Sequence, residues 1–253
     1  CLSAGFVLYF LSKKAEYKVR LLYKEEIRTC EKDAKNIVSL GTAGFVMQLT
    51  NSLVSICCNN VLSATGGDVY VSVMTIISSV RQMIETPIWS ISEGSSPVIS
   101  YNYGAKRPKK VIEAWITMSV LALIYSLIAW SVILFAPKFL IGIFSSDKSL
   151  MIDTVPAMKL YFSAFIFMLF QYTGQTMFKS LNKKKQAIFF SILRKVIIVV
   201  PMTYIFPYVF HMGSNGVFMA EPVSNVIGGS LCFIVMLLTV LPELKQMNSD
   251  LSS

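Results

Sequence analysis

The sequence predicts an all-α, polytopic membrane helical bundle, and three features support this fold class. Of the 253 residues, 54% are hydrophobic and 15% are charged, whereas a soluble domain carries about 25% charged residues. The apolar residues form runs of the length that a helix needs to cross a bilayer, about 20 residues. The net charge of +9 lies in short basic stretches between those runs, so we expect contact with membrane lipid and no nucleic-acid partner.

The first 35 residues contain a short apolar run and then a densely charged segment. Residues 2–11 supply only half of a membrane span, so residues 1–12 are interpreted as the end of a truncated transmembrane helix. Residues 13–35 carry eight basic and five acidic side chains, many of them at helical i,i+4 spacing. We interpret this segment as a solvated cytosolic linker.

Residues 36–241 are expected to form six transmembrane helices, followed by a cytosolic tail at residues 242–253. The expected helices cover residues 36–61, 70–95, 111–135, 157–178, 187–210 and 217–241. The glycines at 66 and 67 predict the turn after the first helix, and Pro97 and Pro137 follow the second and third. Prolines inside the other helices indicate bends, because neighbouring helices satisfy the carbonyls that a proline leaves free.

Lysine and arginine are distributed very unequally between alternate connections. One side of the bundle holds seventeen of them and the other side two or three. Since cytoplasmic loops carry the excess of basic residues, we expect the lysine-rich connections and the C-terminus in the cytosol. The turns near Gly66, Ser145 and Gly213 would then face outward, in a multi-pass protein of the cell membrane.

The second span contains charges that membrane helices seldom carry. Arg81 and Glu85 lie one turn apart, so they can pair on one face, and Glu93 lies two turns further along. One interpretation is that Arg81 and Glu85 neutralise each other and fix the packing. The other is that Glu85 or Glu93 binds a proton, a sodium ion or a cationic substrate, because charges inside a membrane usually mark a pathway.

Polar side chains also follow one face of the first span and part of the fourth. These side chains belong to Gln48, Asn51, Ser52, Ser55, Asn59, Gln171, Thr173 and Gln175. They form either interhelical hydrogen bonds or the wall of a polar cavity. Glu221 precedes Pro222 near the outer end of the sixth span. We expect it to be exposed there, and the alternative is that it gates the outer mouth.

The sequence offers little for catalysis or metal binding. The five cysteines have no metal-ligand spacing, and the single histidine, His211, lies in a loop without an obvious partner. No convergent set of nucleophile, base and acid is visible. We therefore expect neither an enzyme nor a bound cofactor or metal.

The stretch EGSSPVISYNYGAK at residues 93–106 resembles the MATE family of multidrug and toxic compound extrusion transporters. In that family such a segment joins the eighth and ninth helices on the cytosolic side, which gives Pro97, Asn102 and Gly104 the role of a structural turn. Residues 174–194 and 216–222 are similar to the tenth-to-eleventh helix region and to the start of the twelfth helix.

The resemblance implies one lobe of a twelve-helix carrier with two six-helix lobes, working by alternating access. The partner would be the missing N-terminal lobe of the same protein. Small organic cations and drugs would leave in exchange for protons or sodium ions, without a cofactor.

The sequence departs from the family pattern at two positions. Some members carry a Glu in the seventh helix and an Asp in the tenth, where this chain has Asn51 and Met168. Neither can titrate, so coupling would depend on an acid in the missing lobe, or on Glu85 or Glu93. An alternative is a flippase for lipid-linked oligosaccharides, which would need basic residues such as Arg81 and Arg194 in its cavity.

Overall fold

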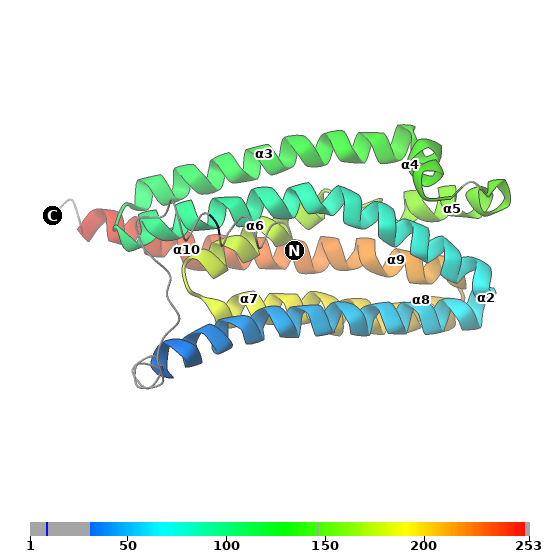
Figure 1. Cartoon of the computed structure of the whole chain (residues 1–253), viewed down its shortest axis with the longest axis horizontal. Coiled ribbons are helices and arrows are strands. Elements are labelled where there is room, and N and C mark those ends of the chain that lie inside the picture. The colour runs from blue at the N-terminus through cyan, green and yellow to red at the C-terminus, as the bar shows by residue number, and fades with distance from the viewer. Residues whose placement is uncertain (1–8, 10–30, 146, 251–253) are drawn as a thin grey trace. The chain divides into compact units, whose positions relative to one another are not determined.

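The computed structural model describes residues 9, 31–145 and 147–250, and these residues form helices joined by short connections (Figure 1). The chain divides into two compact units, residues 1–45 and residues 46–253, and the second unit holds all the candidate site residues. The expected helix end at residues 1–12, apart from Tyr9, and most of the expected linker at residues 13–35 lie outside the described residues. The all-α membrane-type fold predicted from the composition is confirmed.

Helix α2 (Glu31–Gly104) folds back on itself at Gly67, whose φ of 71° and ψ of −169° are not helical. Glycine adopts such a positive φ at little cost, because it has no Cβ. Figure 1 shows the two parts of α2 running in opposite directions from this point. We call residues 46–66 the first arm and residues 68–104 the second arm.

The second arm is longer than predicted, because Pro97 does not end it. The helix continues to Gly104, with both Pro87 and Pro97 inside it. Two serines flanking Pro97 bind α6 (Phe167–Ser180) instead: Ser96 Oγ lies 2.8 Å from Ser180 Oγ, and Ser100 Oγ donates to the Ser180 carbonyl over 3.0 Å. Contacts with a neighbouring helix thus hold the segment around Pro97 in place.

The third predicted span is α3 (Pro108–Phe135), and it begins with a proline at a position where the missing N–H costs nothing. The short helix α4 (Pro137–Phe144) follows, and then α5 (Lys148–Tyr161). Asp147 caps α5 by accepting hydrogen bonds from the Ser149 side chain and backbone, which lower the pKa of the Asp147 carboxyl below its ordinary value.

The fourth predicted span, residues 157–178, is not one helix. Helix α5 ends at Tyr161 and α6 begins at Phe167. At the break, Trp130 Nε1 of α3 donates a hydrogen bond over 3.0 Å to the Phe162 carbonyl, which also accepts one from the Phe165 backbone N–H over 3.1 Å. Phe162 and Phe165 are buried there, so side-chain packing stabilises the interruption.

The last two spans each contain a π-helical segment. The fifth runs through α7 (Lys184–Ile192), the π-helix η2 (Leu193–Val199) and α8 (Val200–Tyr208). The sixth runs through α9 (Ser214–Ser224), the π-helix η3 (Asn225–Gly229) and α10 (Ser230–Asp250), which ends nine residues beyond the predicted limit of 241. A proline lies close to each widened turn, Pro201 after η2 and Pro222 before η3, and its ring displaces the carbonyl four residues earlier.

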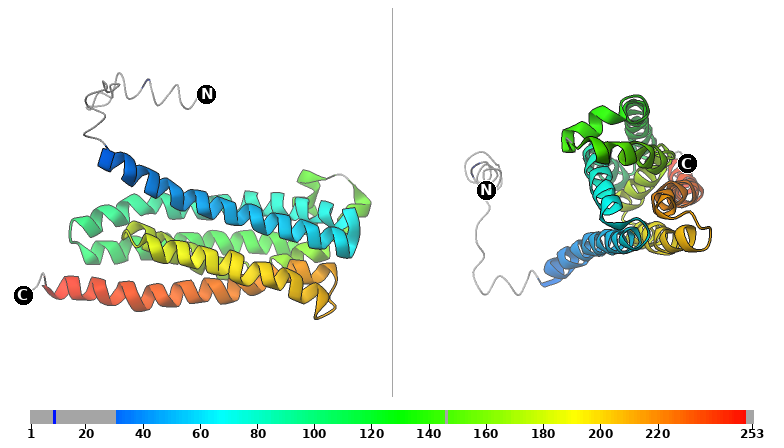
Figure 2. Two further views of the ribbon diagram at one scale, coloured as in Figure 1. Left: turned by 90° about the horizontal axis from the view of Figure 1, so that it is seen from below. Right: turned by 90° about the vertical axis from the view of Figure 1, so that its right-hand side faces the viewer.

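In the second unit, the two arms of α2 contact different helices. Figures 1 and 2 both place α8 beside the first arm, where Cys58 Sγ lies 3.8 Å from Thr203 Oγ1. The second arm contacts α5 and α6 through its polar side chains. Helix α9 packs against α5 and α8, and α10 packs against α3 and α6.

Four helices of the described residues are long and apolar enough to cross a membrane: Gln48–Gly104, Pro108–Phe135, Lys184–Tyr208 and Ser214–Ser249. The first of these contains the fold-back at Gly67, so it corresponds to two of the six predicted spans. The broken fourth span is not among them. One end of the second unit contains Gly67, Ser145 and Gly213, and we call it the Gly67 end. The other end contains Lys106 and Lys183, and we call it the lysine-rich end.

Candidate functional site

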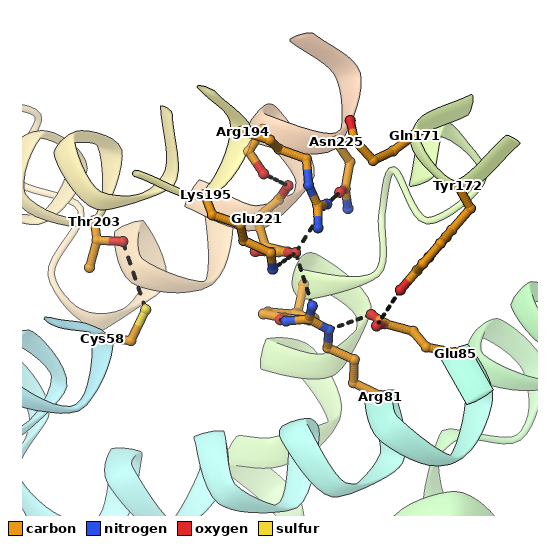
Figure 3. Close-up of polar contacts among 12 residues, drawn as sticks. Cys58, Arg81, Glu85, Gln171, Tyr172, Arg194, Lys195, Thr203, Glu221 and Asn225 are labelled. Atoms are coloured by element: carbon orange, nitrogen blue, oxygen red, sulfur yellow. Dashed lines mark hydrogen bonds and ion pairs between the residues drawn. The ribbon is translucent and has the colours of Figure 1, made fainter. Parts of the chain in front are cut away.

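Glu221 lies at the centre of a cluster of charged side chains in the interior of the bundle (Figure 3). Its Oε1 atom is 3.6 Å from Arg81 Nη2, 3.4 Å from Arg194 Nη1 and 3.4 Å from Lys195 Nζ. The residue is only 4% exposed, so the expectation that Glu221 is exposed is wrong. The reason is that α9 packs between α5 and α8, which cover its surface.

The second arm of α2 supplies the more accessible part of this cluster. Arg81 Nε donates to Glu85 Oε1, which confirms the predicted pairing. Arg81 Nη1 also donates to Tyr161 Oη over 2.8 Å, and Tyr172 Oη donates to Glu85 Oε2 over 3.3 Å. The pair is therefore tied to α5 and α6 through Tyr161 and Tyr172.

The two π-helical segments supply the deeper part of the cluster. Arg194 and Lys195 are consecutive residues of η2, and both contact Glu221. Arg194 Nη1 also donates to Asn225 Oδ1 in η3. A Cβ on Gly228 would come within 2.8 Å of Arg194 Cγ, so glycine leaves the room that the arginine stem occupies. π-Helical turns occur often at functional sites, and here the two are joined through Arg194, which contacts Asn225 in η3 and the Glu221 carboxylate.

The cluster has more positive than negative charge. Among the described residues it combines the cations of Arg81, Arg194 and Lys195 with the carboxylates of Glu85 and Glu221, a formal excess of one positive charge. The side chains of Arg194, Lys195 and Glu221 are 6–8% exposed. Burying charges costs several kcal/mol per ion unless they are paired, so a surplus of charge at this place needs a reason.

Gln171 and Gln175 are buried, and both tie α6 to α7. Gln171 Nε2 donates to the Phe190 carbonyl over 3.5 Å, and Gln175 Nε2 donates to the Ala187 carbonyl over 3.2 Å. Gln171 lies at the edge of the cluster, where α6 packs on η3 (Figure 3). Its Oε1 has no hydrogen-bond partner within the described part of the chain.

Gln48 and Asn51 are not part of the cluster. They lie on the first arm of α2 and are exposed, together with Ser52, Ser55 and Asn59 of the same polar face. Val54, Cys58 and Val61 of the same arm are buried. The polar face of this arm therefore points away from the core of the second unit.

Glu93 belongs to a separate set of contacts at the lysine-rich end. Its Oε1 accepts a hydrogen bond from Lys179 Nζ over 2.6 Å, and both side chains are about one-third exposed. Nearby, Glu243 of α10 pairs with Lys183 and accepts a hydrogen bond from Tyr103 Oη over 2.6 Å. These ion pairs fasten the end of the second arm to α6 and α10.

The predicted turn residues Pro97, Asn102 and Gly104 lie in the last turns of α2, and the turn follows them. Asn102 Nδ2 donates back to the Val98 carbonyl over 2.8 Å. The residue with a left-handed backbone is Lys106, with a φ of 54°. Gly104 is helical, and a Cβ there would meet nothing within 4 Å. The structural role of these three residues stays a prediction.

One pattern in the sequence does point to the site residues that were not predicted. Arg194, Lys195 and Glu221 are charged residues inside apolar runs, which is unusual enough to suggest a common site. That Tyr161, Tyr172 and Asn225 join them could not be predicted, because each lies on another helix and their types are common in membrane spans.

Among known protein families, the model of the MatE family matches residues 44–205 of this chain. No curated protein sequence matches the chain significantly. A solved structure of a MATE protein in the bent conformation superposes with a TM-score of 0.81 at 19% identity, over 100% of this chain and 55% of that one.

Two further structures match equally well. An outward-facing multidrug resistance MATE family transporter of the MOP superfamily gives a TM-score of 0.84 at 19% identity, over 98% of this chain and 54% of that one. A MOP superfamily transporter from Pyrococcus furiosus, described as having a binding pocket of reverse polarity, gives 0.83 at 20% identity, over 98% and 54%. At this identity the similarity shows the fold alone, and the chain spans about half the length of these proteins.

Proposed function

The chain belongs to the MatE family of membrane transporters, and we propose that it forms the C-terminal lobe of a secondary active exporter that works by alternating access. Its similarity to about half of each solved relative supports the proposal that a second lobe of six helices completes the transporter. Paired lobes of this kind generally hold their substrate between them. The exposed polar face with Gln48 and Asn51 is suited to line such a space.

The observation that carries this proposal is the buried charge cluster around Glu221. An anchor or a scaffold has no need for five ionised side chains inside a membrane bundle, whereas a carrier that moves ions does. Arg81 and Glu85 are the members with the most exposed side chains, at 22% and 14%, so an ion or substrate would reach the cluster through them.

We propose organic cations and drugs as substrates, exchanged for protons or sodium ions. The exchange of one organic cation for one proton or sodium ion moves no net charge, so the concentration gradient of the coupling ion must drive it. A tenfold ion gradient supplies about 1.4 kcal/mol, which offsets the export of the substrate against a tenfold gradient. A solved structure of this fold belongs to a multidrug resistance transporter, which supports this substrate class.

A second candidate function is a flippase for lipid-linked oligosaccharides, and one observation favours it. Arg81, Arg194 and Lys195 converge on one point, and such a group of cations would attract a pyrophosphate. The Pyrococcus furiosus transporter, with its pocket of reverse polarity, shares the fold. In this chain, however, the two carboxylates Glu85 and Glu221 already engage the three cations.

We further propose that the protein resides in the cell membrane with its lysine-rich end and its C-terminus in the cytosol. This orientation follows from the excess of lysine and arginine in the connections at that end.

The decisive experiment replaces Glu85 with Gln in the protein with both lobes. In proteoliposomes with an imposed proton or sodium gradient, ethidium export should fall about tenfold, which corresponds to the loss of one charge-assisted contact of about 1.4 kcal/mol. The control is Glu113→Gln, which removes a carboxylate from an exposed ion pair with Lys110 and should leave export unchanged.

Unchanged export in Glu85→Gln would make Glu85 a packing residue and contradict its proposed role. A wild-type protein that leaves ethidium in place and translocates a fluorescent lipid-linked oligosaccharide would support the flippase instead.

A further inference from the structure

The charge surplus of the cluster is the feature that the proposed function does not yet explain. With all five groups ionised, two carboxylates face three cations in a region with little water. An unbalanced charge of this kind is costly, because the low dielectric does not screen it. Loss of one proton from one of the cations would balance the cluster.

Only Lys195 among the three cations is able to lose a proton. A guanidinium stays charged under all conditions that proteins meet, whereas a lysine amine gives up its proton when its surroundings oppose the charge. Both guanidiniums are also held by neutral partners, Arg81 by Tyr161 and Arg194 by Asn225. The Lys195 ammonium has three donors, and within the described residues it makes one hydrogen bond, to Glu221 over 3.4 Å.

The groups that face Lys195 come from every helix packed around it. The nearest charges are those of Glu221 in α9, of Arg194 in η2, and of Arg81 and Glu85 in the second arm of α2. The neighbouring helices also carry neutral polar groups, and these contact other members of the site: Tyr161 on α5 accepts from Arg81, Tyr172 on α6 donates to Glu85, Asn225 on η3 accepts from Arg194, and Cys58 on the first arm lies beside Thr203. Two arginines oppose the positive charge of Lys195, and two carboxylates support it.

We propose that Lys195 is a proton-binding group of the transport cycle, and this inference rests on the proposed exchange of organic cations. In one state Lys195 is protonated and pairs with Glu221. In the other it has released its proton to water on the side of the cluster where Arg81 and Glu85 are partly exposed, and an organic cation is held next to the two carboxylates. One proton leaves and one cationic charge enters, so the charge of the cluster is the same in both states.

This arrangement explains exchange without a titrating carboxylate in the positions of Asn51 and Met168. A bound proton and a bound cation exclude each other, because together they would give the cluster two surplus charges. The affinity of the protein for organic cations should therefore depend on pH. This affinity rises as the pH rises, because the cation binds when the Lys195 amine is neutral.

The experiment measures ethidium binding by fluorescence anisotropy to the purified two-lobe protein between pH 5.5 and 9.5. For the wild type, the affinity should rise about tenfold per pH unit across the titration of one group, with about one proton released per ethidium bound. Lys195→Met, permanently neutral, should bind ethidium tightly at every pH and release no proton. Lys195→Arg, permanently charged, should bind weakly at every pH. The control Lys159→Met changes an exposed lysine on α5 and should behave as the wild type.

The inference is overturned if Lys195→Met keeps both the pH dependence and the proton release, because a carboxylate would then be the titrating group. Lys195→Met removes a buried charge, so this variant should fold even if Lys195→Arg does not. Its binding and proton release alone are enough to test whether Lys195 is the titrating group. The transport proposal has a separate readout, gradient-driven ethidium export by the wild type. A wild type with proton-linked binding and no export refutes the exporter and leaves the proton site, whereas a wild type that binds no ethidium at any pH refutes both.

Discussion

Glu221 holds three cations together in a part of the bundle with little access to water. Its carboxylate contacts Arg81, Arg194 and Lys195, and no two of these distances differ by more than a few tenths of an ångström. The three cations lie on α2 and η2. Other contacts of the cluster join α2 to α5 and to α6, and join η2 to η3. The Glu221 side chain therefore affects both the charge balance and the relative positions of α9, α2 and η2.

Glu221→Gln should be strongly destabilising, because it leaves three buried cations with the single carboxylate of Glu85. Breaking a buried ion pair on one side costs about 3–5 kcal/mol. The midpoint of thermal unfolding in detergent should fall by several degrees, and the double variant Glu221→Gln, Lys195→Met should recover part of the loss.

Glu113→Gln provides the matched control for Glu221→Gln. Glu113 is 64% exposed and pairs with Lys110 over 2.8 Å, and such exposed pairs contribute about 0.2–1 kcal/mol. Equal effects of the two substitutions would show that the cluster around Glu221 is as well solvated as the surface, and would contradict the structural argument.

The helices are interrupted where they meet the cluster. Helices α5 and α6 are separated by residues 162–166. The fifth and sixth spans change from α-helix to π-helix over residues 193–199 and 225–229. Each interruption displaces side chains from the positions that a regular helix would give them. Pro201 explains the widening of η2, because its ring displaces the Ile197 carbonyl within that segment, whereas the ring of Pro222 acts on the Phe218 carbonyl in α9, ahead of η3. Gly228 allows η2 to come close to η3, and Gly229 allows α6 to do so.

Gly229→Ala should loosen the contact between η3 and α6. A Cβ at Gly229 would lie 2.5 Å from the Phe167 carbonyl oxygen, a backbone atom that cannot rotate away. Overpacking of this kind costs about 1–3 kcal/mol, and we expect a lower unfolding midpoint together with weaker ethidium binding.

Gly94→Ala is the control for Gly229→Ala, since it makes the same change in α2 with nothing within 4 Å of the new Cβ. Alanine is the better helix former by up to about 1 kcal/mol, so this variant should be as stable as the wild type or slightly more so. If Gly229→Ala behaves in the same way as Gly94→Ala, the contact with α6 is not tight in the folded protein.

In the second unit as a whole, charge is divided between the interior and the two ends. The interior holds the cluster around Glu221, and the lysine-rich end holds the ion pairs of Glu93 and Glu243 with Lys179 and Lys183. The Gly67 end is closed by turns at Gly67, near Ser145 and at Gly213, with few basic residues. This asymmetry of the loops is the physical basis for the proposed orientation in the membrane.

The orientation can be tested by cysteine labelling of the full-length protein in intact cells, after replacement of the native cysteines. Lys148→Cys lies at the Gly67 end and should react with a membrane-impermeant maleimide added outside. Lys106→Cys lies at the lysine-rich end and should react only after the membrane is permeabilised. Both lysines are exposed, so burial cannot explain a difference. The opposite pattern would place the lysine-rich end outside.

The sequence by itself determined the fold class, because the scarcity of charge and the length of the apolar runs leave few other ways to satisfy the backbone. It also determined the fold-back near Gly67, the end of α3 at Phe135, and the pairing of Arg81 with Glu85. Each of these is a local property: a run length, a glycine, a proline or an i,i+4 spacing. The resemblance of residues 93–106 to the MATE family was likewise readable from neighbouring residues, and the family match confirms it.

Only the tertiary structure decided which charges meet. Glu221 was expected at an exposed position, and its burial depends on the packing of α9 against α5 and α8. Gln48 and Gln171 were grouped as polar residues of one type, yet the first is exposed and the second is buried beside the cluster. Partners such as Arg81 and Glu221 are separated by 140 residues, and no periodicity connects them. Helix packing brings them together, because buried charges are stable only where opposite charges from other helices reach them.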